Sequence, residues 1–386
     1  MKEGWENKKL GEVCDFEGGS QPPKSEWINH SQEGYVRMLQ IRDFTKSRNF
    51  EIEYVKITKK LRLCKADDIL IGRYGASVGK ILTGLAGAYN VAIIKSIPDE
   101  KVIVKSYIRR YFESSLFQGI LFKVCASRAA QAGFSKEDIC DALIPVPPLS
   151  EQQSIVDYLD SAFAKIDVMK ANAEKALNEA KAIFQASLKE MLEPKEGWVH
   201  NKLGDVCNVV GGGTPDTKNK DYWSGNIPWA TVSDMNCDVL KSTGYYITDK
   251  GLNESSSRII KTGEIIIATR VGLGKVCKLA VDTAINQDLK GIIPKNNNIL
   301  RDFIFYYFKH KTKYIVDNGI GATVKGVKIK FIEGLSFDYP SLSEQQSIVE
   351  TLDSLKSKVD RLQANYEKIS QECDALKQAI LRQVFE

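Results

Sequence analysis

The sequence of this chain repeats itself once, and the length of the repeat limits the folds that are possible. The octapeptide LSEQQSIV occurs at 149–156 and again at 342–349, an interval of 193 residues. A second pair of matching segments, which begin at Glu3 and Glu196, has the same interval, and twice 193 is the chain length of 386. Solenoid repeats span only about 20–50 residues, so this repeat is a whole domain. The sequence therefore predicts two related units in tandem.

Positive charge is concentrated in two parts of the chain. Residues 1–149 carry a net charge of +5 and residues 193–341 carry +4, whereas 150–192 and 342–386 carry −2 each. This distribution indicates two modules that contact a polyanion, attached to neutral or acidic supports. Soluble domains with a slight basic excess would give the same charges, so this pattern leaves both interpretations open.

Composition argues against several other classes of protein. None of the eight cysteines lies in a CxxC pair or at a spacing typical of zinc ligands, so we expect reduced thiols and a cytoplasmic location. No segment contains the roughly 20 apolar residues that a membrane helix needs, and the N-terminal residues do not resemble a signal peptide. We therefore expect no contact with a membrane.

Each copy of the octapeptide marks the beginning of a long helix. Ser150 and Ser343 follow proline-containing segments, and Gln153 and Gln346 stand three residues later, which is the spacing of a capping box. Neither proline nor glycine occurs again before residue 193 in the first case or before the end of the chain in the second. The sequence therefore predicts spacer helices over 150–192 and 343–386.

Both predicted helices carry the seam of a coiled coil, with residues that advance by alternating steps of three and four. The seam positions are Val156, Leu159, Phe163, Ile166, Lys170, Ala173, Leu177, Ala180, Phe184, Ser187 and Met191 in the first helix, and Ile348, Leu352, Leu355, Val359, Leu362, Tyr366, Ile369, Cys373, Leu376 and Ile380 in the second. We expect the two helices to pair antiparallel, with an internal pseudo-twofold repeat. The alternative is that each helix folds back on its own block.

The segments before the helices, block one (1–149) and block two (193–342), are predicted to be α+β domains of the α/β type. Each combines short strands, an aromatic helix (106–122 or 302–316) and a polar loop that contains glycine. The segment Gly75–Lys80 resembles a phosphate-binding loop, but Ile81 stands where a magnesium-binding Ser or Thr is needed. No methyltransferase motif, nucleophile elbow or metal-ligand spacing is visible, so we expect a non-catalytic chain without a cofactor or metal.

The remaining polar residues are those typical of nucleic-acid recognition. Arg reads guanine, Gln reads adenine, and Lys contacts backbone phosphates. The candidate DNA-binding residues of block one are Gln21, Lys24, Arg37, Gln40, Arg42, Arg73, Tyr74, Ser77, Lys80, Arg128 and Gln131. Those of block two are Thr214, Lys218, Lys220, Tyr222, Trp229, Thr231, Arg270, Lys275, Thr323, Lys325 and Lys328.

The octapeptide also indicates a surface for a partner protein. A helix cap explains only its Ser and Gln, yet the neighbouring polar residues are identical in both copies. We therefore expect one surface to be presented twice, to two copies of one partner. Recent duplication would give the same identity. The candidate partner-binding residues are Glu151, Gln152, Gln153, Glu344, Gln345 and Gln346.

The whole arrangement resembles the DNA-specificity subunit of type I restriction–modification enzymes. The resemblance rests on the order block, helix, block, helix, on PLSEQQSIVDYLD and SLSEQQSIVETLD at the helix starts, and on GWENKKLGEVCDFEGGSQP and GWVHNKLGDVCNVVGGGTP at the block starts. It covers nearly the entire chain. It implies two target-recognition domains, 1–149 and 193–342, which read the two halves of an interrupted site in double-stranded DNA while the helices set the spacing.

The resemblance also implies the partners of the chain. Two methyltransferase subunits would dock on the helices, and restriction subunits with motor and nuclease activities would join the full complex. S-adenosylmethionine and ATP would bind to those partners rather than to this chain. Two other functions stay open on the residues alone: a self-contained DNA methyltransferase or nuclease with an unrecognised motif, and a scaffold protein that does not bind DNA.

Overall fold

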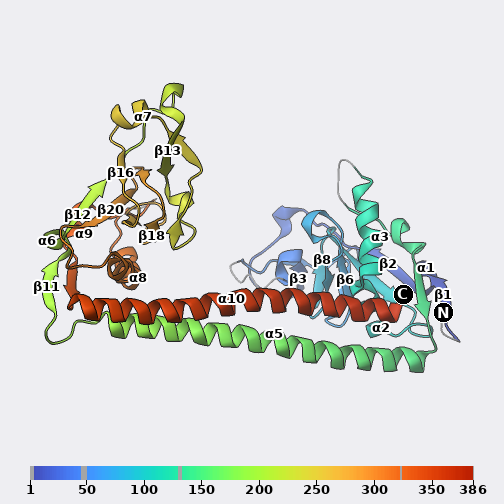
Figure 1. The fold of residues 1–386 in the computed structure, drawn as a ribbon. Helices are drawn as coiled ribbons and strands as arrows, with labels where there is room; N and C mark the ends of the chain where they lie inside the picture. Colours follow the sequence, from blue (N-terminus) through green and yellow to red (C-terminus); the bar gives the residue numbers. More distant parts are fainter. Residues whose placement is uncertain (1–3, 45–49, 129–132, 322–323, 386) are drawn as a thin grey trace. The chain divides into compact units, whose positions relative to one another are not determined.

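The computed structural model describes residues 4–44, 50–128, 133–321 and 324–385, which belong to two compact units (Figure 1). Unit 1 comprises Met1–Ala173 and Tyr366–Glu386, and unit 2 comprises Glu174–Asn365. Each unit therefore contains one block and a part of both long helices. No helix among the described residues is long and apolar enough to cross a membrane.

The described residues of block one form two four-stranded sheets and a two-stranded one. The strand orders are β2-β9-β6-β7, β4-β3-β8-β5 and β1-β10, and β3 pairs with β8 in parallel while the other pairs are antiparallel. The strands are β1 (Glu6–Lys9), β2 (Cys14–Gly18), β3 (Tyr35–Leu39), β4 (Tyr54–Lys56), β5 (Leu63–Cys64), β6 (Ile69–Gly72), β7 (Ile81–Leu82), β8 (Gly87–Tyr89), β9 (Ile93–Pro98) and β10 (Leu143–Val146). The helices are α1 (Leu10–Val13), α2 (Lys105–Glu113), α3 (Ser115–Ala126) and α4 (Glu137–Cys140).

Block two repeats this architecture with one additional strand in a sheet. Its strand orders are β12-β20-β17-β18-β14, β15-β13-β19-β16 and β11-β21. The strands are β11 (Val199–Lys202), β12 (Cys207–Gly211), β13 (Trp223–Ala230), β14 (Val239–Leu240), β15 (Tyr245–Ile247), β16 (Arg258–Ile260), β17 (Ile265–Ala268), β18 (Val276–Leu279), β19 (Thr283–Ile285), β20 (Leu289–Pro294) and β21 (Ser336–Tyr339). The helices are α6 (Leu203–Val206), α7 (Asp249–Asn253), α8 (Arg301–Asp317) and α9 (Ile329–Glu333). The predicted α+β fold is confirmed.

The aromatic segments form the cores of both blocks, as their spacing predicts. Helix α8 is one continuous helix, and its ring-bearing residues from Phe303 to Phe308 are buried. The corresponding segment of block one is not a single helix, because Ser114 ends α2 and begins α3. The Ser114 hydroxyl accepts a hydrogen bond from the backbone N–H of Phe117 at 3.4 Å, which makes Ser114 an N-cap. The prediction of one helix over 106–122 was therefore wrong.

The two long helices, α5 (Leu149–Met191) and α10 (Leu342–Phe385), run antiparallel to one another within each unit (Figure 1). In unit 1, Lys377 Nζ lies 2.6 Å from Asp167 Oδ1 and Lys170 Nζ lies 3.2 Å from Asp374 Oδ1. In unit 2, Lys181 Nζ donates to Gln363 Oε1 at 2.8 Å. These pairs share one antiparallel register, so the predicted antiparallel pairing is confirmed.

Two seam positions were predicted incorrectly. Leu376 is 47% exposed, whereas Leu381 is 1% exposed. Similarly, the buried residue near the end of α5 is Leu188 rather than Ser187. A straight α-helix drifts by about 20° per heptad from a 3.5-residue seam, so the buried face moves away from the other long helix. At both places the buried face has turned toward the block of the same unit, where Leu381 and Leu188 join the apolar cores.

Candidate nucleic-acid interface

In block one, five loop segments meet beyond the ends of the parallel strands β3 and β8. The backbone N–H of Asn90 donates to Leu39 O at 3.1 Å, and that of Ser20 donates to Tyr89 O at 3.0 Å. The backbone N–H of Arg73 donates to Ala92 O at 2.8 Å, and that of Phe134 donates to Arg73 O at 3.3 Å. We call residues 18–20, 39–42, 72–74, 89–92 and 133–134 the five-loop surface of block one.

Block two builds the same surface with the same backbone bonds. Asn286 N–H donates to Ala230 O at 3.1 Å, and Gly213 N–H donates to Ile285 O at 3.0 Å. Thr269 N–H donates to Asp288 O at 2.8 Å, and Val327 N–H donates to Thr269 O at 2.9 Å. The five-loop surface of block two therefore comprises residues 211–213, 230–231, 268–270, 285–288 and 326–327.

A glycine in each block allows this close approach of the loops. A Cβ atom on Gly19 would lie 2.0 Å from Asn90 O, and one on Gly212 would lie 2.1 Å from Ile285 O. No side chain fits at such distances, so these positions require glycine. The glycine pairs that the two block starts share in sequence thus have a structural cause.

Two further residues of each block shape the surface, although the sequence did not predict them. Asn90 Oδ1 accepts from Ala92 N–H at 3.2 Å, and Asn286 Oδ1 accepts from Asp288 N–H at 3.0 Å, which are Asx turns. Asp43 accepts from Gln40 N–H at 2.9 Å, and Asp234 accepts from Thr231 N–H at 2.8 Å. The aligned Asn and Asp of the two copies were the signal that could have found them.

The five-loop surface of block one includes four of its predicted DNA-binding residues, Gln40, Arg42, Arg73 and Tyr74. Arg73 Nε donates to Phe134 O at 3.1 Å, and the Arg73 guanidinium lies 5.2 Å from the ring centre of Tyr74. Tyr74 is 40% exposed, so its ring is accessible. Gln21, Ser77 and Lys80 are in the adjoining loops, where Gln21 and Lys80 are exposed.

A carboxylate holds several of these donors. Lys24, Gln40 and Arg42 all bind to Glu53, with the Gln40 amide at 2.8 Å. Partial burial acts to raise the pKa of Glu53, but hydrogen bonds from Lys24 and Gln40 and the charges of Lys24 and Arg42 outweigh it and lower this pKa. Glu53 therefore stays ionised and orients three side chains.

The other two arginines predicted in block one are also paired. Arg37 Nη2 lies 2.6 Å from Asp43 Oδ1, and only 24% of the Arg37 side chain is exposed. Arg128 donates to both carboxylate oxygens of Asp138, at 2.6 and 2.7 Å, and to Gly133 O at 3.0 Å. Arg128 thus lies beside the five-loop surface. Arg37 acts through Asp43, whose carboxylate also accepts from the backbone N–H of Gln40 in that surface. Gln131 lies outside the described residues.

Block two places Thr231 and Arg270 on its five-loop surface, and Thr214 directly beside it. Arg270 Nη1 lies 3.4 Å from Asp288 Oδ1 and its side chain is 56% exposed. The Thr214 hydroxyl donates to Gln287 Oε1, and the Thr231 hydroxyl donates to Asp234 Oδ2 at 2.9 Å. Lys275 ends the turn that carries Arg270, just as Lys80 ends the turn that carries Tyr74, and both lysines are exposed.

The other predicted residues of block two are less close to this surface. Lys325 and Lys328 are exposed and flank the segment 326–327, while Thr323 lies outside the described residues. Lys218, Lys220 and Tyr222 belong to a separate segment that packs against α7, where the backbone N–H of Thr248 donates to Tyr222 O at 3.0 Å. The Tyr222 hydroxyl donates to Glu254 at 2.5 Å, and this bond raises the pKa of Tyr222.

Trp229 is not a surface residue, so its prediction as a DNA contact was wrong. It is 5% exposed, and its Nε1 donates to Gly213 O at 3.1 Å and to Ser257 Oγ at 3.2 Å. Its ring packs edge-on against Trp223, with centres 5.1 Å apart. Trp229 instead fixes the segment that carries Gly213.

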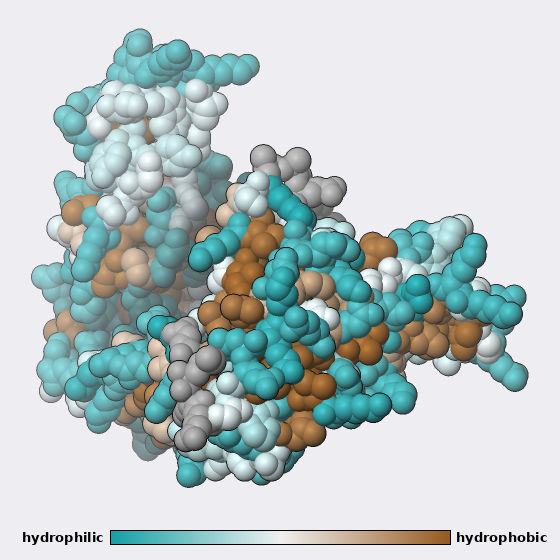
Figure 2. Space-filling model, turned by 90° about the vertical axis from the view of Figure 1, so that its right-hand side faces the viewer, coloured by the Kyte–Doolittle hydropathy of each residue, from teal (hydrophilic) through white to brown (hydrophobic). Residues whose placement is uncertain are grey.

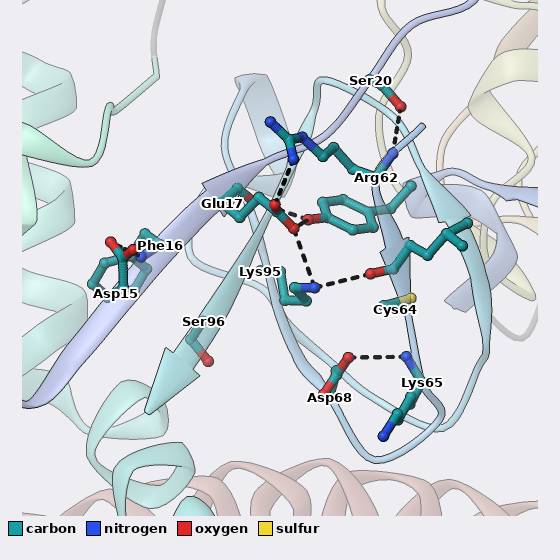
Figure 3. A network of polar contacts seen from close by, with 12 residues as sticks. Asp15, Phe16, Glu17, Ser20, Arg62, Cys64, Lys65, Asp68, Lys95 and Ser96 are labelled. Carbon is teal, nitrogen blue, oxygen red and sulfur yellow. Dashed lines mark hydrogen bonds and ion pairs between the residues drawn. The ribbon is translucent and has the colours of Figure 1, made fainter. Parts of the chain in front are cut away.

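A polar network beneath the surface of block one joins its two four-stranded sheets (Figure 3). Glu17 of β2 accepts from the Tyr89 hydroxyl at 3.0 Å and lies 3.1 Å from Lys95 Nζ and 2.9 Å from Arg62 Nη1. Burial, and then the hydrogen bond to Glu17, raise the pKa of Tyr89. The network holds loop 18–20 to both sheets, because Arg62 N–H also donates to Ser20 Oγ at 3.1 Å. Its carboxylate is neutralised by two cations, so the network is structural.

The octapeptides contribute less exposed surface than the sequence predicts. Gln152 and Gln345 are 0% exposed, so their assignment as partner-binding residues was wrong. Glu151 and Glu344 accept hydrogen bonds from Trp5 and Trp198, at 3.0 and 3.2 Å. Gln153 and Gln346 are exposed, and their side-chain amides donate to Asp157 and Glu350 of their own helices, at 2.9 Å each.

The remaining surface offers no assembled metal site, since the described residues contain no group of three or more His, Cys, Asp or Glu that could hold a metal ion. On the face of the molecule in Figure 2, hydrophilic residues are interspersed with smaller hydrophobic patches. Large apolar residues that are exposed include Phe122 of α3, at 75%, and Ile320, at 86%.

The chain thus belongs to a class of proteins with two tandem α+β domains of one fold. Each domain presents the same loop surface and is followed by a long helix. The chain belongs to the family described as the type I restriction modification DNA specificity domain, whose model matches residues 2–179 and again 195–371.

Relatives with known names support this membership. The chain is 37% identical over 164 residues to the MjaIX specificity subunit of Methanocaldococcus jannaschii, a match that covers 41% of this chain and 38% of that one. It is 32% identical over 217 residues to the EcoR124I/EcoR124II specificity subunit of Escherichia coli, covering 54% and 52%. The matches thus span about half or less of these two relatives. The StySPI specificity subunit of Salmonella potsdam is 22% identical, with 100% of this chain and 89% of that one covered.

Solved structures share the fold. A chain from a type I R-M system, in a structure concerned with complex assembly and conformational transition, has a TM-score of 0.80 at 18% identity and covers 99% of this chain and 97% of its own length. The HsdS subunit of Thermoanaerobacter tengcongensis has a TM-score of 0.58 at 17% identity, with 100% and 97% covered.

Proposed function

We propose that this chain is the DNA-specificity subunit of a type I restriction–modification complex. Recognition domains 1–149 and 193–342 each read one half of an interrupted site in double-stranded DNA. Spacer helices 150–192 and 343–386 set the distance between the halves. The chain itself carries no catalytic centre in this proposal and functions in the cytoplasm.

The observation that carries the proposal is the repeated five-loop surface with different side chains. The backbone bonds of the two surfaces coincide, but Arg73 and Tyr74 of block one correspond to Thr269 and Arg270 of block two. Base edges are read by side chains, so one scaffold with two sets of side chains should read two different sequences. Two short sequences read together supply the selectivity that one block cannot reach at about 1–3 kcal/mol per base pair.

The partners follow from family membership and from the long helices. Two methyltransferase subunits would bind the helices, and restriction subunits would complete the nuclease. Of the octapeptide glutamines predicted to bind a partner, Gln153 and Gln346 are exposed at the beginning of each long helix. Catalysis and its cofactors would then reside in the partners.

A site selection tests the DNA-binding part of this function. The full chain, alone and with its methyltransferase subunits, is incubated with random-sequence duplexes, and the bound DNA is sequenced. We expect two dissimilar short sequences separated by a fixed unread gap. A single contiguous sequence, or no enrichment, would contradict the proposal. Binding should weaken steeply as salt rises, which distinguishes it from a protein scaffold.

An activity assay tests the alternative of a self-contained enzyme. The chain alone, incubated with DNA and either S-adenosylmethionine or Mg²⁺, should neither methylate nor cleave. Turnover that persists after the chain is purified away from all partners would contradict the proposal.

A further inference from the structure

We propose that Gln152 and Gln345 are positioning residues that fix the direction in which each long helix leaves its own block, and thereby restrict the gap length that the protein accepts. This inference rests on the proposed function, because it concerns the spacing of two half-sites. Neither residue contacts the five-loop surface.

In unit 1 the Gln152 side chain makes three hydrogen bonds to the backbone of block one. Its Oε1 accepts from Val104 N–H at 2.7 Å, and its Nε2 donates to Val102 O at 3.0 Å and to Pro147 O at 2.8 Å. Val104 is the N-cap residue of α2. One buried amide therefore joins the first turn of α5 to the segments that precede α2 and α5.

Unit 2 repeats the arrangement with Gln345. Its Oε1 accepts from Leu300 N–H at 2.9 Å, and its Nε2 donates to Asn298 O and to Pro340 O, each at 2.9 Å. Leu300 is the N-cap residue of α8. The blocks differ in most of their side chains, so the preservation of all three bonds indicates a geometry that both units need.

A second bond at each helix start makes the connection rigid. Trp5 and Trp198 donate to Glu151 and Glu344, which precede the two glutamines. About two turns further along, Arg110 binds Asp160 in unit 1, and the Tyr306 hydroxyl donates to Asp353 in unit 2 at 2.5 Å. Each helix is thus fixed to its block at three successive points, which restricts its tilt.

The buried amide matters most among these bonds, because its loss leaves backbone groups without partners in a dry environment. A small tilt then has a large effect at a distance. Twenty helical residues span about 30 Å, and a tilt of about 7° moves the far end of such a lever by about one base-pair step of 3.4 Å. Loosening the amide should therefore widen the range of gaps that fit.

The test uses the full chain and duplexes that carry both selected half-sites at the preferred gap or at gaps one or two base pairs shorter or longer. The variants are Gln152→Met and Gln345→Met, singly and together. The matched controls are Gln185→Met and Gln371→Met, which alter exposed glutamines elsewhere on α5 and α10. We expect wild type and controls to favour one gap by about ten-fold or more, and the double Gln152/Gln345 variant to lose most of that preference. The half-site sequences themselves should not change.

Glu151→Ala with Glu344→Ala provides a second variant that leaves the buried amides intact. It should relax gap selectivity in the same direction but less, and it keeps the inference testable if the methionine variants do not fold. Unchanged gap preference in folded variants of either kind, or equal relaxation in the controls, would overturn the inference. If the wild-type chain selects no bipartite sequence, it is the proposed function that fails.

Discussion

Several basic side chains at the candidate interface are held by carboxylates. Arg128 binds Asp138, Arg270 lies near Asp288, and Lys24 and Arg42 share Glu53. Each carboxylate orients its partner, but it also opposes the approach of a phosphate. Such pairs should lower the affinity for arbitrary DNA more than the affinity for a sequence whose base edges satisfy the same donors.

Replacing Glu53 tests this at one residue. In Glu53→Gln, Lys24 and Arg42 lose their counter-charge and the chain gains one net positive charge, so random-sequence DNA should bind more tightly and with a steeper salt dependence, by about one unit of slope. The affinity for the selected site should rise by a smaller factor. Salt-titrated gel shifts measure both, with Glu100→Gln, an exposed carboxylate of the same block, as the control. Weaker binding of Glu53→Gln to random-sequence DNA would contradict the view that this carboxylate opposes the approach of a phosphate.

Residue types were predictable from the sequence, but their surroundings were not. The basic residues and glycines of the loops stood out because they recur or cluster along the chain. The burial of Trp229 and of Gln152 was invisible, since it depends on strands and loops that are distant in sequence. Asn90 and Asp43 were missed because their side chains bond to nearby backbone, a role that residue type alone does not separate from a solvated one.

At the scale of elements, the prediction succeeded where the pattern is local and long. Helices α5 and α10 begin within one residue of the predicted positions and run antiparallel in each unit. The seam prediction failed at Leu376, because a heptad pattern assumes that the other long helix is the sole packing partner. In unit 1 the block also packs on α10, where the Phe385 ring lies 5.3 Å from that of Tyr107.

Two alanine substitutions in α10 distinguish the observed face from the predicted one. Leu381→Ala removes a side chain that is 1% exposed and should lower the free energy of unfolding by about 2–5 kcal/mol. Leu376→Ala, five residues earlier on the same helix, removes one that is 47% exposed and should change it by less than about 0.5 kcal/mol. Urea unfolding followed by circular dichroism measures both. Equal losses of unfolding free energy in the two variants would instead support the regular heptad seam, in which Leu376 is a packed position.

An ion cluster links block two to helix α10 within unit 2 and should make that unit sensitive to acid. Asp238 Oδ1 lies 2.5 Å from Lys309 Nζ on α8, and Asp238 Oδ2 lies 3.1 Å from Lys356 Nζ on α10. Burial acts to raise the pKa of Asp238, but both lysines outweigh it, so the pKa falls below the model-compound value of 3.8. The stability that this carboxylate contributes is present above that pH and is lost as the pH falls through the lowered pKa.

Asp238→Asn should therefore be less stable than wild type at pH 7, by about 1 kcal/mol, and the difference should shrink below about pH 4 as the wild-type carboxyl becomes protonated. Urea denaturation between pH 3 and 7 measures it. Glu190→Gln changes an exposed carboxylate of the same unit and should leave the pH profile as it is. A stability difference between wild type and Asp238→Asn that grows as the pH falls would contradict the stabilising role of the ionised Asp238 carboxylate.

At the scale of the whole molecule, the repeat predicted more than any motif. It indicated that both blocks share one fold, and the paired backbone bonds around Asn90 and Asn286 extend that likeness to the candidate interface. The sequence did not reveal which loops meet, because the offset between the copies drifts along the blocks. The two copies thus share the scaffold and the helix starts but differ in the side chains of the five-loop surface.

A paired deletion tests whether the helices act as a ruler. Removing residues 171–177 of α5 and 367–373 of α10 keeps the antiparallel register of Lys170 with Asp374 and of Lys181 with Gln363. Seven residues are one heptad, so the seam stays on the same face, while each helix shortens by about 10 Å, or about three base pairs of DNA. The preferred gap should become about three base pairs shorter, and both half-sequences should remain unchanged.

The affinity should fall at the same time, because three base pairs also rotate one half-site by about 100° around the DNA axis, and the duplex must twist to compensate. Site selection on the deleted chain measures gap and half-sequences together, and circular dichroism confirms that the helices still form. Deleting only 171–177 is the control: it leaves helices of unequal length, so it should weaken their pairing instead of producing a new sharp gap. An unchanged gap in the paired deletion, with half-sequences intact, would mean that the helices hold the blocks but do not measure the distance between half-sites.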